Sequence, residues 1–391
     1  MSRGLSTRSV IAAAVAIVGI GAATLALTNG SSPAKDAGSD EWTTISAAAK
    51  GQSVKLWMWG GEDALNRYID DDVVPAAAAQ GVNLERVPID DTATAISRIV
   101  AERDAGKNDG GAVDLLWVNG KNFEQGKAAG LWLTNWSTRL PNNIFLNPDD
   151  TTLTSDFGVP TDGQEAPWSR AAFVFAYDSA KVDAPPQDFT ELAQYVRTHP
   201  GRVTYPAPPD FTGSAFVRQA VQALGEEQAF AMLSDIRPFL WQNGDTYPKD
   251  EAELERLFSS GEVDLAMSYN PNFVDTAVSI GSFPDTVRPY VMSPGTLQNV
   301  SFLAIPSNAS SPEGAQVVAD LMLSPALQAA KFTRVGIPTV LDLSRLGSAA
   351  SAFTQAKASP HRLEQFGSSL VELPAAQVPE IDRRWQDEIA R

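Results

Sequence analysis

From residue 53 onward, short apolar runs that fit β-strands alternate with longer segments whose apolar residues recur at helical spacing. The apolar runs are Val54–Trp59, Asn83–Ile89 and Val113–Val118. The expected helices are residues 63–79, 93–105 and 123–129. Strands separated by helices in this order form a βαβαβ unit, which predicts a parallel sheet with helices on both faces. The fold class is therefore α/β, and 391 residues suit two lobes better than one core.

A second set of elements follows an irregular stretch at residues 131–170. The expected strands are residues 172–177, 203–205, 263–269 and 300–305. The expected helices are residues 189–198, 213–224, 226–233, 251–259 and 312–322. The tail to Arg391 has a mostly helical pattern, so we expect C-terminal helices over residues 346–391.

The N-terminal segment has the features of an export signal or a membrane anchor. Arg3 and Arg8 precede the uncharged run Val10–Leu27, and no acidic residue occurs before Asp36. The length of this run fits a cleaved signal peptide and an uncleaved anchor equally well, so both stay open for residues 1–28. Residues 29–51 are expected to be a linker, rich in Gly and Ser at its start. The segment predicts an extracytoplasmic protein, in contact with the membrane only here.

Composition excludes several classes of function. The formal net charge of −17 argues against a nucleic-acid partner, which would need surplus Lys and Arg. The chain has no cysteine, so thiol nucleophiles, disulfides and thiolate metal sites are impossible. It has only two histidines, His199 and His361, which are far apart in the sequence. No metal site and no cofactor are expected, although an oxygen-only metal site is not excluded by residue counts.

Aromatic and amide residues gather where the expected strands end. In open α/β sheets, ligands bind outside the carboxyl ends of the strands. Aromatic faces there can stack on a ring or attract an organic cation, and polar groups then fix its orientation. The same aromatic residues also fit core packing, and each remains open to both interpretations. The candidate ligand-binding residues at these ends are Trp59, Gly61, Glu62, Trp117, Asn119, Asn122, Tyr177, Asp178, Tyr269 and Asn270.

A second candidate is the start of the helix expected after residue 210. Phe211, Thr212, Gly213 and Ser214 lie at this start, and free N–H groups there can bind a carboxylate or phosphate. The alternative is an ordinary helix start whose N–H groups are capped by the side chain of Asp210 or Thr212.

Sequence signatures of enzymes are weak. The chain contains no phosphate-binding loop, no dinucleotide fingerprint and no nucleophile-elbow motif. A glycosidase would need two carboxylates across a cleft, for which only Glu62 and Asp178 suggest themselves. We therefore predict that the chain is not an enzyme and has no catalytic residue.

Four segments resemble a known family. They are Gly60–Ile69, Val113–Phe123, Gln164–Ser179 and His199–Ser214. In this order they resemble the solute-binding proteins of ABC importers with the type II periplasmic-binding fold, in the YnjB-like branch related to iron-, thiamine- and polyamine-type binding proteins. The stretch Ser301–Lys331 resembles the returning strand and helix of the same proteins.

The resemblance implies two α/β lobes that are joined by strands at a hinge and close on a ligand. It implies lobe 1 at residues 52–175 plus 285–345 and lobe 2 at residues 176–284. It also implies an extracytoplasmic receptor, monomeric, that captures a small polar solute and delivers it to ABC permease and ATPase subunits. A membrane-tethered sensor, or an enzyme acting on carbohydrates or phosphate esters, are the alternatives.

The residues indicate two opposing classes of ligand. Aromatic residues with Glu62, Asp178 and Asp210 favour a cationic or polyhydroxylated molecule, whereas N–H groups near Gly213 favour an anion. If the sheet order is that of the family that the chain resembles, Trp59 and Tyr269 face each other across the cleft.

Overall fold

The computed structural model describes residues 37–354, 359–363 and 368–390. The apolar run Val10–Leu27, expected to be a signal or anchor, lies outside the described residues. Within the described ranges, no helix is long and apolar enough to cross a membrane. The second half of the linker expected at residues 29–51 forms a helix, α1 (Ala37–Ala48).

The predicted βαβαβ unit is present. Strand β1 (Ser53–Trp59) pairs in parallel with β2 (Asn83–Ile89) on one side and with β3 (Leu115–Val118) on the other. Helix α4 (Thr92–Asp104) connects β2 to β3, and the side chain of Asp91 caps it by accepting a bond from the Ala93 N–H. The carboxyl ends of β1 and β3 therefore lie at one edge of the sheet, as the alternation predicted.

Strands β6, β10 and the short β11 (Ser369–Leu370) complete the larger sheet, whose order is β11-β10-β3-β1-β2 with β6 also paired to β10. Strand β10 is antiparallel to both β3 and β6. Strand β6 (Glu165–Ala172) lies mostly in a stretch that the sequence analysis left irregular, and β10 (Thr296–Ala304) begins earlier than predicted. Their ladder runs from Gln298 opposite Ala172 to Ala304 opposite Glu165, with a bulge between Ser301 and Phe302.

The same two strands lead directly into the smaller sheet. Phe173 follows β6, and its N–H donates to the Leu297 carbonyl of β10 at 2.9 Å. The chain then enters β7 (Val174–Asp178), which pairs antiparallel with β8 (Leu265–Ser268) and β9 (Val287–Tyr290). We call the part built on the larger sheet lobe 1 and the part built on the smaller sheet lobe 2.

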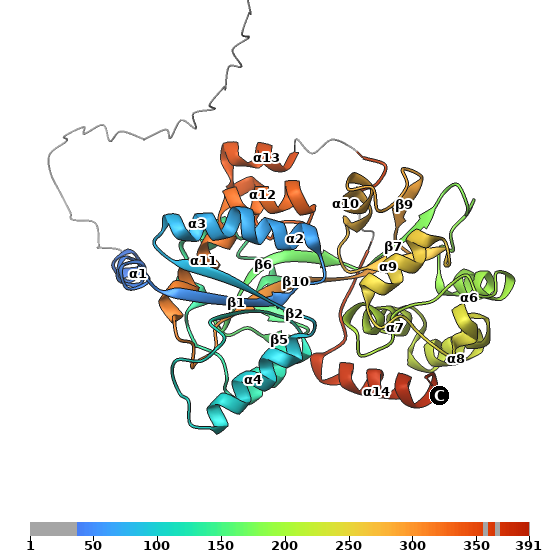
Figure 1. Cartoon of the computed structure of the whole chain (residues 1–391), viewed down its shortest axis with the longest axis horizontal. Coiled ribbons are helices and arrows are strands. Elements are labelled where there is room, and N and C mark those ends of the chain that lie inside the picture. Colours follow the sequence, from blue (N-terminus) through green and yellow to red (C-terminus); the bar gives the residue numbers. More distant parts are fainter. Residues whose placement is uncertain (1–36, 355–358, 364–367, 391) are drawn as a thin grey trace, which may run out of the picture. The chain divides into compact units, whose positions relative to one another are not determined.

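Helices cover both sheets (Figure 1). The helices of lobe 1, besides α4, are α2 (Asp63–Tyr68), α3 (Val74–Ala79), α5 (Lys121–Ala128), α11 (Pro312–Leu323), α12 (Pro325–Val335) and α13 (Ser351–Thr354). The helices of lobe 2 are α6 (Phe189–Thr198), α7 (Phe211–Leu224), α8 (Glu226–Ile236), α9 (Glu251–Ser260), α10 (Phe273–Ser279) and α14 (Val378–Glu388).

One predicted helix is interrupted. The sequence predicted a single helix over residues 63–79, but the structure has α2, a π-helical turn at Ile69–Val73 and then α3. Pro75 explains the change, because it has no N–H to donate to the preceding turn and a wider turn avoids its ring.

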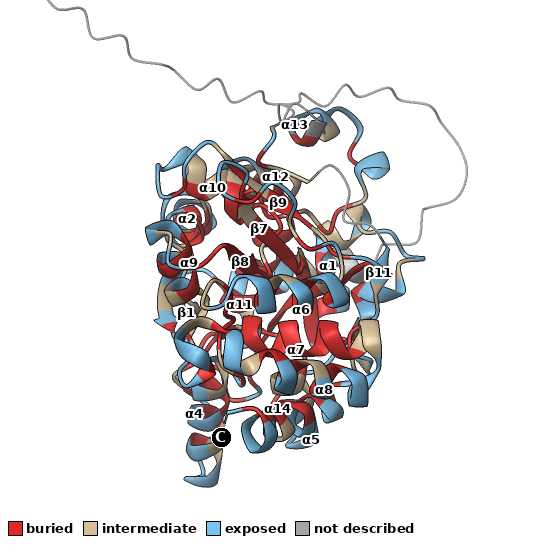
Figure 2. Cartoon of the chain, turned by 90° about the vertical axis from the view of Figure 1, so that its right-hand side faces the viewer, coloured by how far each residue is buried: buried red, intermediate tan, exposed pale blue. Residues whose placement is uncertain are grey.

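Helix α7 forms the centre of lobe 2. Ten consecutive residues from Thr212 to Val221 are buried, and Figure 2 shows the helix in the buried colour behind its neighbours. Phe216 on this helix packs against Phe175 of β7 at 6.4 Å and against Phe189 of α6 at 5.8 Å between ring centroids. A helix buried on nearly every side is held in place by both the sheet and the other helices.

The C-terminal part differs from its prediction. Residues 336–350 contain only short 3₁₀ turns, and Ser369–Leu370 form the short strand β11. Outside this part, the strand predicted at residues 203–205 does not form. Helix α14 packs on lobe 2, where the indole N–H of Trp385 donates to the Tyr205 hydroxyl at 2.9 Å. Strand β11 thus pairs with the start of β10, and α14 returns the end of the chain to lobe 2. The ring of Phe353 in α13 packs on Phe332 of α12 in lobe 1.

We predict that Trp385→Ala destabilises the protein by about 3–5 kcal/mol, the usual cost of truncating a fully buried tryptophan. Trp385 is 2% exposed in the core of lobe 2, and its ring packs edge-on against Tyr247 at 5.0 Å. The measurement is urea unfolding followed by circular dichroism. Arg383→Ala on the exposed face of the same helix is the matched control and should change stability by no more than about 0.5 kcal/mol. Equal small effects of both variants would show that α14 is not part of the core.

Candidate functional site between the two lobes

The lobe 1 side of the site is the end of β1. The Trp59 side chain is half-buried, and its indole lies against Gly61, where any Cβ would overlap the ring. A residue without a side chain is therefore required at position 61 for this packing. Trp59 thus keeps part of its ring accessible at the strand end, where the sequence analysis placed a ligand-binding residue.

Glu62 joins the two lobes. It precedes α2 in lobe 1, and its Oε1 accepts a hydrogen bond from Nδ2 of Asn270 at 2.9 Å. Asn270 follows β8 in lobe 2, and its backbone N–H donates to the Ser268 hydroxyl at 2.9 Å. Two residues predicted from separate strand ends are therefore in direct contact.

Two further carboxylates approach Glu62 from α9. Glu251 accepts a hydrogen bond from the Ser268 hydroxyl at 2.6 Å and another from the Thr212 hydroxyl. Glu255 lies one turn later on the same face of the helix. We call Glu62, Glu251 and Glu255 the carboxylate cluster.

The members of the carboxylate cluster hold their protons more tightly than exposed glutamates. Burial, together with the negative charge of Glu251, raises the pKa of Glu62 to about 8, against a lowering by the Asn270 hydrogen bond. Burial raises the pKa of Glu251 to about 7, although its Ser268 and Thr212 hydrogen bonds act in the opposite direction. Burial and the charges of Glu251 and Glu62 raise the pKa of Glu255 to about 8. Three such groups together favour either bound protons or a bound cation.

The N–H groups at the start of α7 are already used. Asp210 caps the helix, with Oδ1 accepting from the Gly213 N–H at 2.9 Å, and burial raises the pKa of Asp210 to about 6. Gly213 is required for packing, because a Cβ there would overlap the Pro206 carbonyl oxygen. Of the two alternatives for this helix start, the structure shows the capped helix, because the chain's own carboxylate accepts the Gly213 N–H.

Tyr269 is buried inside lobe 2. Its ring packs against Phe173 at 5.9 Å and Phe211 at 5.2 Å, and its hydroxyl donates to Oε1 of Glu372 at 2.5 Å. The expectation that Tyr269 faces Trp59 as an open aromatic wall is not met, because the Tyr269 side chain is 7% exposed. Phe211, which is 44% exposed, is the more accessible ring of this pair.

A family model of bacterial extracellular solute-binding proteins matches residues 73–360 of the chain. The chain belongs to this family.

Two curated relatives from Escherichia coli (strain K12) agree with this assignment. Protein YnjB is 36% identical over 328 residues, which are 78% of this chain and 84% of that protein. The thiamine-binding periplasmic protein is 28% identical over 230 residues, 55% of this chain and 64% of that protein.

Solved structures share the fold. A periplasmic thiamin binding protein matches with a TM-score of 0.65 and 21% identity, over 87% of this chain and 96% of that one. The periplasmic binding protein P5PA matches with a TM-score of 0.64 and 18% identity, over 86% and 99%. The predicted type II periplasmic-binding fold with two lobes is confirmed.

Family membership also confirms the predicted function. This solute-binding protein is the substrate-binding receptor of an ABC importer, and it works outside the cytoplasm. As a receptor of this kind it binds a small ligand and interacts with a permease.

The structure places two candidate residues of this binding protein away from the others. Strand β7 runs antiparallel to β8, with Val174 opposite Ser268 and Tyr177 opposite Leu265. Tyr177 and Asp178 therefore lie at the opposite end of the smaller sheet from Asn270. The strand-end prediction holds only for parallel strands, whose carboxyl ends meet at one edge of the sheet. The suggested pair of Glu62 with Asp178 is likewise not formed, since Asp178 bonds locally to the Ala180 N–H and to Lys181.

The residues at the end of β3 divide between core and site edge. Trp117 packs edge-on against the buried ring of Trp168, with centroids 5.3 Å apart, in the core of lobe 1. Asn119 and Asn122 are half-buried where α5 begins. Asn119 and Asn122 thus lie at the same sheet edge as Trp59, whereas Trp117 contributes mainly to packing.

Sequence reasoning missed three important side chains. Glu251 and Glu255 are spaced four residues apart on one helix, which is a detectable pattern, but such pairs are usually solvated. Arg218 lies in the middle of an apolar helix, an unusual place for a charge and the signal that was overlooked. Among the described residues, no three His, Asp or Glu side chains converge as ligands for a metal ion.

We predict that, without ligand, Glu62→Gln becomes more stable relative to the wild-type protein as the pH rises. The pKa of Glu62 is about 8 in the folded protein and about 4.3 in an unfolded chain, so folding favours the protonated form. That contribution is complete below pH ~4.3 and is lost progressively up to about pH 8. The neutral Gln does not lose it, so the stability of the variant relative to wild type should grow across this range and then level off.

Urea midpoints at pH 5, 7 and 9, as approximate sampling points of that range, test this prediction. Glu85→Gln, on the exposed side of β2, removes one charge elsewhere in lobe 1 and serves as the control. A constant difference between Glu62→Gln and wild type at all three pH values would contradict the prediction.

Proposed function

We propose that the protein binds a small organic cation between its two lobes and delivers it to the permease. The observation that supports this most directly is the carboxylate cluster, to which both lobes contribute. Glu62 comes from lobe 1, and Glu251 and Glu255 come from lobe 2. A ligand that pairs with all three would favour the closed arrangement of the lobes, because the same charge then contacts both.

The raised pKa values support a cation over a neutral solute. In the absence of a partner, three neighbouring carboxyl groups lower their mutual repulsion by retaining protons near neutral pH. A bound cation would supply the opposite charge, lower these pKa values and displace protons. The site would thus exchange protons for its ligand.

The accessible ring of Trp59 supports a ligand with a cationic ring. An indole face attracts a positive charge and gives a flat surface for stacking. One curated relative is named a thiamine-binding periplasmic protein, and thiamine contains a positively charged aromatic ring. Thiamine is therefore the probe with which we would test the proposal.

The remaining parts of the proposal concern organisation. We propose that the two lobes, as defined by the larger and the smaller sheet, move about β6 and β10. The lobe boundary expected at residues 284 and 285 needs correction, because β9 (Val287–Tyr290) pairs with β7 and so belongs to lobe 2. We also propose that residues 1–28 direct export or anchor the chain, that the protein acts as a monomer, and that it performs no chemistry on its ligand. The chain connections support this hinge, because β6 continues through Phe173 into β7, and β10 follows β9 of the smaller sheet.

We predict that thiamine binding releases protons at pH 7 and that Glu62→Gln weakens it about ten- to a hundredfold. The loss of one charge-assisted contact costs about 1.5–3 kcal/mol, which corresponds to that factor. Isothermal titration in buffers of different ionisation enthalpy measures both quantities. Glu85→Gln should bind like wild type. Unchanged affinity in Glu62→Gln, or proton uptake on binding, would rule out the carboxylate cluster as the cation site.

We predict that Trp59→Ala weakens thiamine binding by about 1–3 kcal/mol, the usual cost of losing a stacking face in a binding site. Its effect on folding stability should be smaller than that of Trp168→Ala, whose ring is 1% exposed and whose truncation should cost about 3–5 kcal/mol. Titration and urea unfolding give the two numbers. If Trp59→Ala were as unstable as Trp168→Ala, or folded normally with full affinity, Trp59 would not be a ligand-binding residue.

A further inference from the structure

A buried arginine lies next to the site just described. Arg218 of α7 is 1% exposed, and its guanidinium lies over the ring of Phe157 from lobe 1 at 5.5 Å and over Phe211 from lobe 2 at 5.7 Å. Its Nη1 donates to the Ser214 hydroxyl at 2.6 Å. The other edge of the guanidinium, with Nε and Nη2, has the planar geometry that pairs well with a carboxylate or phosphate.

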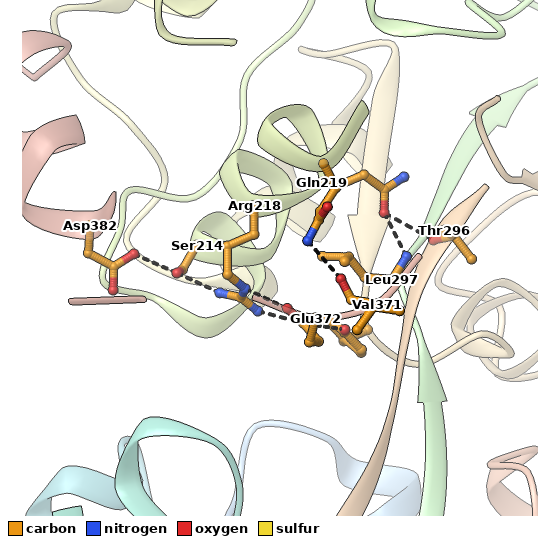
Figure 3. A network of polar contacts seen from close by, with 10 residues as sticks. Ser214, Arg218, Gln219, Thr296, Leu297, Val371, Glu372 and Asp382 are labelled. Carbon is orange, nitrogen blue, oxygen red and sulfur yellow. Dashed lines mark hydrogen bonds and ion pairs between the residues drawn. The ribbon is translucent and has the colours of Figure 1, made fainter. Parts of the chain in front are cut away.

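The C-terminal segment supplies that carboxylate. Nε of Arg218 donates to Oε2 of Glu372 at 2.9 Å, and Nη2 donates to Oε1 at 3.2 Å. The Tyr269 hydroxyl donates to the same Oε1. Figure 3 shows the Glu372 side chain aligned with Arg218, and Ser214 and Asp382 continue the network on the other side. Glu372 therefore receives three hydrogen bonds from lobe 2.

Glu372 enters from the surface and not from the core of the lobe. The preceding residue, Val371, is 79% exposed, and its carbonyl accepts a bond from the side chain of Gln222 at 2.8 Å. Before it, β11 forms a two-residue parallel pairing with the start of β10. Glu372 is buried, whereas Val371 before it and Pro374 after it are exposed. The Glu372 side chain therefore extends into the lobe from a segment that lies at the surface.

The segment that carries Glu372 also contacts both lobes. The Ala375 N–H donates to the Phe157 carbonyl of lobe 1 at 3.1 Å. Asp382 of α14 accepts from the Ser214 hydroxyl at 2.5 Å and pairs with Lys121 of lobe 1 at 3.3 Å. The segment thus crosses the boundary between the lobes beside the β6–β10 hinge.

We propose that Arg218 and Tyr269 form an anion subsite next to the cation site, with Ser214 holding Arg218 in place, and that Glu372 fills this subsite as a built-in carboxylate. Glu372 would then determine specificity by excluding ligands that present a phosphate or carboxylate at this position. The inference rests on the proposed function in one respect, namely that the ligand lies between the lobes beside Asn270, the residue after Tyr269.

The balance of charge explains why one side chain has this effect. Two cations, Arg218 and Lys121, pair with two anions, Glu372 and Asp382. The carboxyl of Asp156 is also buried nearby, and burial together with the charge of Glu372 raises its pKa, which favours its neutral form. Burial lowers the pKa of Arg218, but the charge and hydrogen bonds of Glu372 more than offset this, so the pKa of Arg218 stays above its ordinary value. Without Glu372 the group carries an excess positive charge in a buried place, and an external anion would restore neutrality.

The test compares Glu372→Ala with wild type in the full-length protein, using inorganic phosphate as the probe. The Ala variant removes the carboxylate and leaves its space open. In chloride buffers of constant ionic strength, phosphate should raise the melting temperature of Glu372→Ala saturably and bind it at least about tenfold more tightly than wild type. Glu380→Ala removes an exposed charge from the same segment and should behave like wild type.

A second variant locates the phosphate. Adding Tyr269→Phe to Glu372→Ala removes one donor of the subsite and should weaken phosphate binding about tenfold, the factor expected for one hydrogen bond to a charged group. If Glu372→Ala does not fold in chloride, phosphate present during refolding should restore the folded fraction, because it replaces the missing charge.

The proposal is overturned by any of four results. Folded Glu372→Ala fails to bind phosphate, wild type binds it equally well, Glu380→Ala gains the same binding, or phosphate does not restore an unfolded Glu372→Ala. Because these measurements contain no thiamine, their outcome is independent of whether the carboxylate cluster binds a cation. Failure of thiamine to bind wild type would instead count against the proposed function.

Discussion

The antiparallel pairing of β6 with β10 is the interaction on which the arrangement of both lobes depends. The ladder spans Gln298–Ala304 and Glu165–Ala172, and both strands lead directly into the smaller sheet. Backbone hydrogen bonds in such a ladder fix register to one residue. The register of this ladder therefore fixes how the two sheets are connected, and the hydrogen bond from Asn270 to Glu62 is a direct contact between the lobes at the site. A bulge at Ser301 and Phe302 bends the ladder near its middle.

The boundary between the lobes contains two kinds of buried charge. Around Arg218, positive and negative groups are matched and hydrogen-bonded, which is the condition under which buried ions are tolerated. In the carboxylate cluster, like charges are close together, and the three pKa values between about 7 and 8 show that ionising all of them disfavours the folded state. The protein therefore retains an unbalanced group where a ligand can supply the opposite charge.

Much of the fold could be predicted because its signals are local. The strands β1, β2 and β3 are apolar runs separated by helices, and Asp91 is a cap that can be recognised from neighbouring residues. Strand β6 could not be predicted in this way, since Pro167 and Arg170 interrupt its pattern and its partner β10 comes much later in the chain. Whether two strands so far apart in the chain pair is decided by tertiary contacts, so the sequence of one strand alone does not show the pairing.

The site was predictable only in part for a similar reason. Glu62 and Asn270 follow strands whose ends meet, so the strand-end rule found both. The rule placed Tyr177 wrongly, because the direction of β7 relative to β8 cannot be read from either strand alone. Glu372 has no local signal at all, since it belongs to a short exposed strand and acquires its role only by returning to Arg218.

The sequence gives two opposing indications of ligand charge, and the contacts separate them. Acidic residues favoured a cation, whereas the helix start near Gly213 favoured an anion. In the folded protein, Asp210 caps that helix start, and the stronger anion-binding group is Arg218, which Glu372 occupies. Both groups that attract anions are therefore satisfied by carboxylates of the chain itself. Among the described residues, no cation pairs with the carboxylate cluster: Glu62 accepts from an amide, and Glu251 accepts from two hydroxyls and from the Tyr269 backbone N–H. This distribution of charge, with the anion-binding groups neutralised by the chain and the acidic group left without an opposite charge, is the physical basis of the proposed preference for cations.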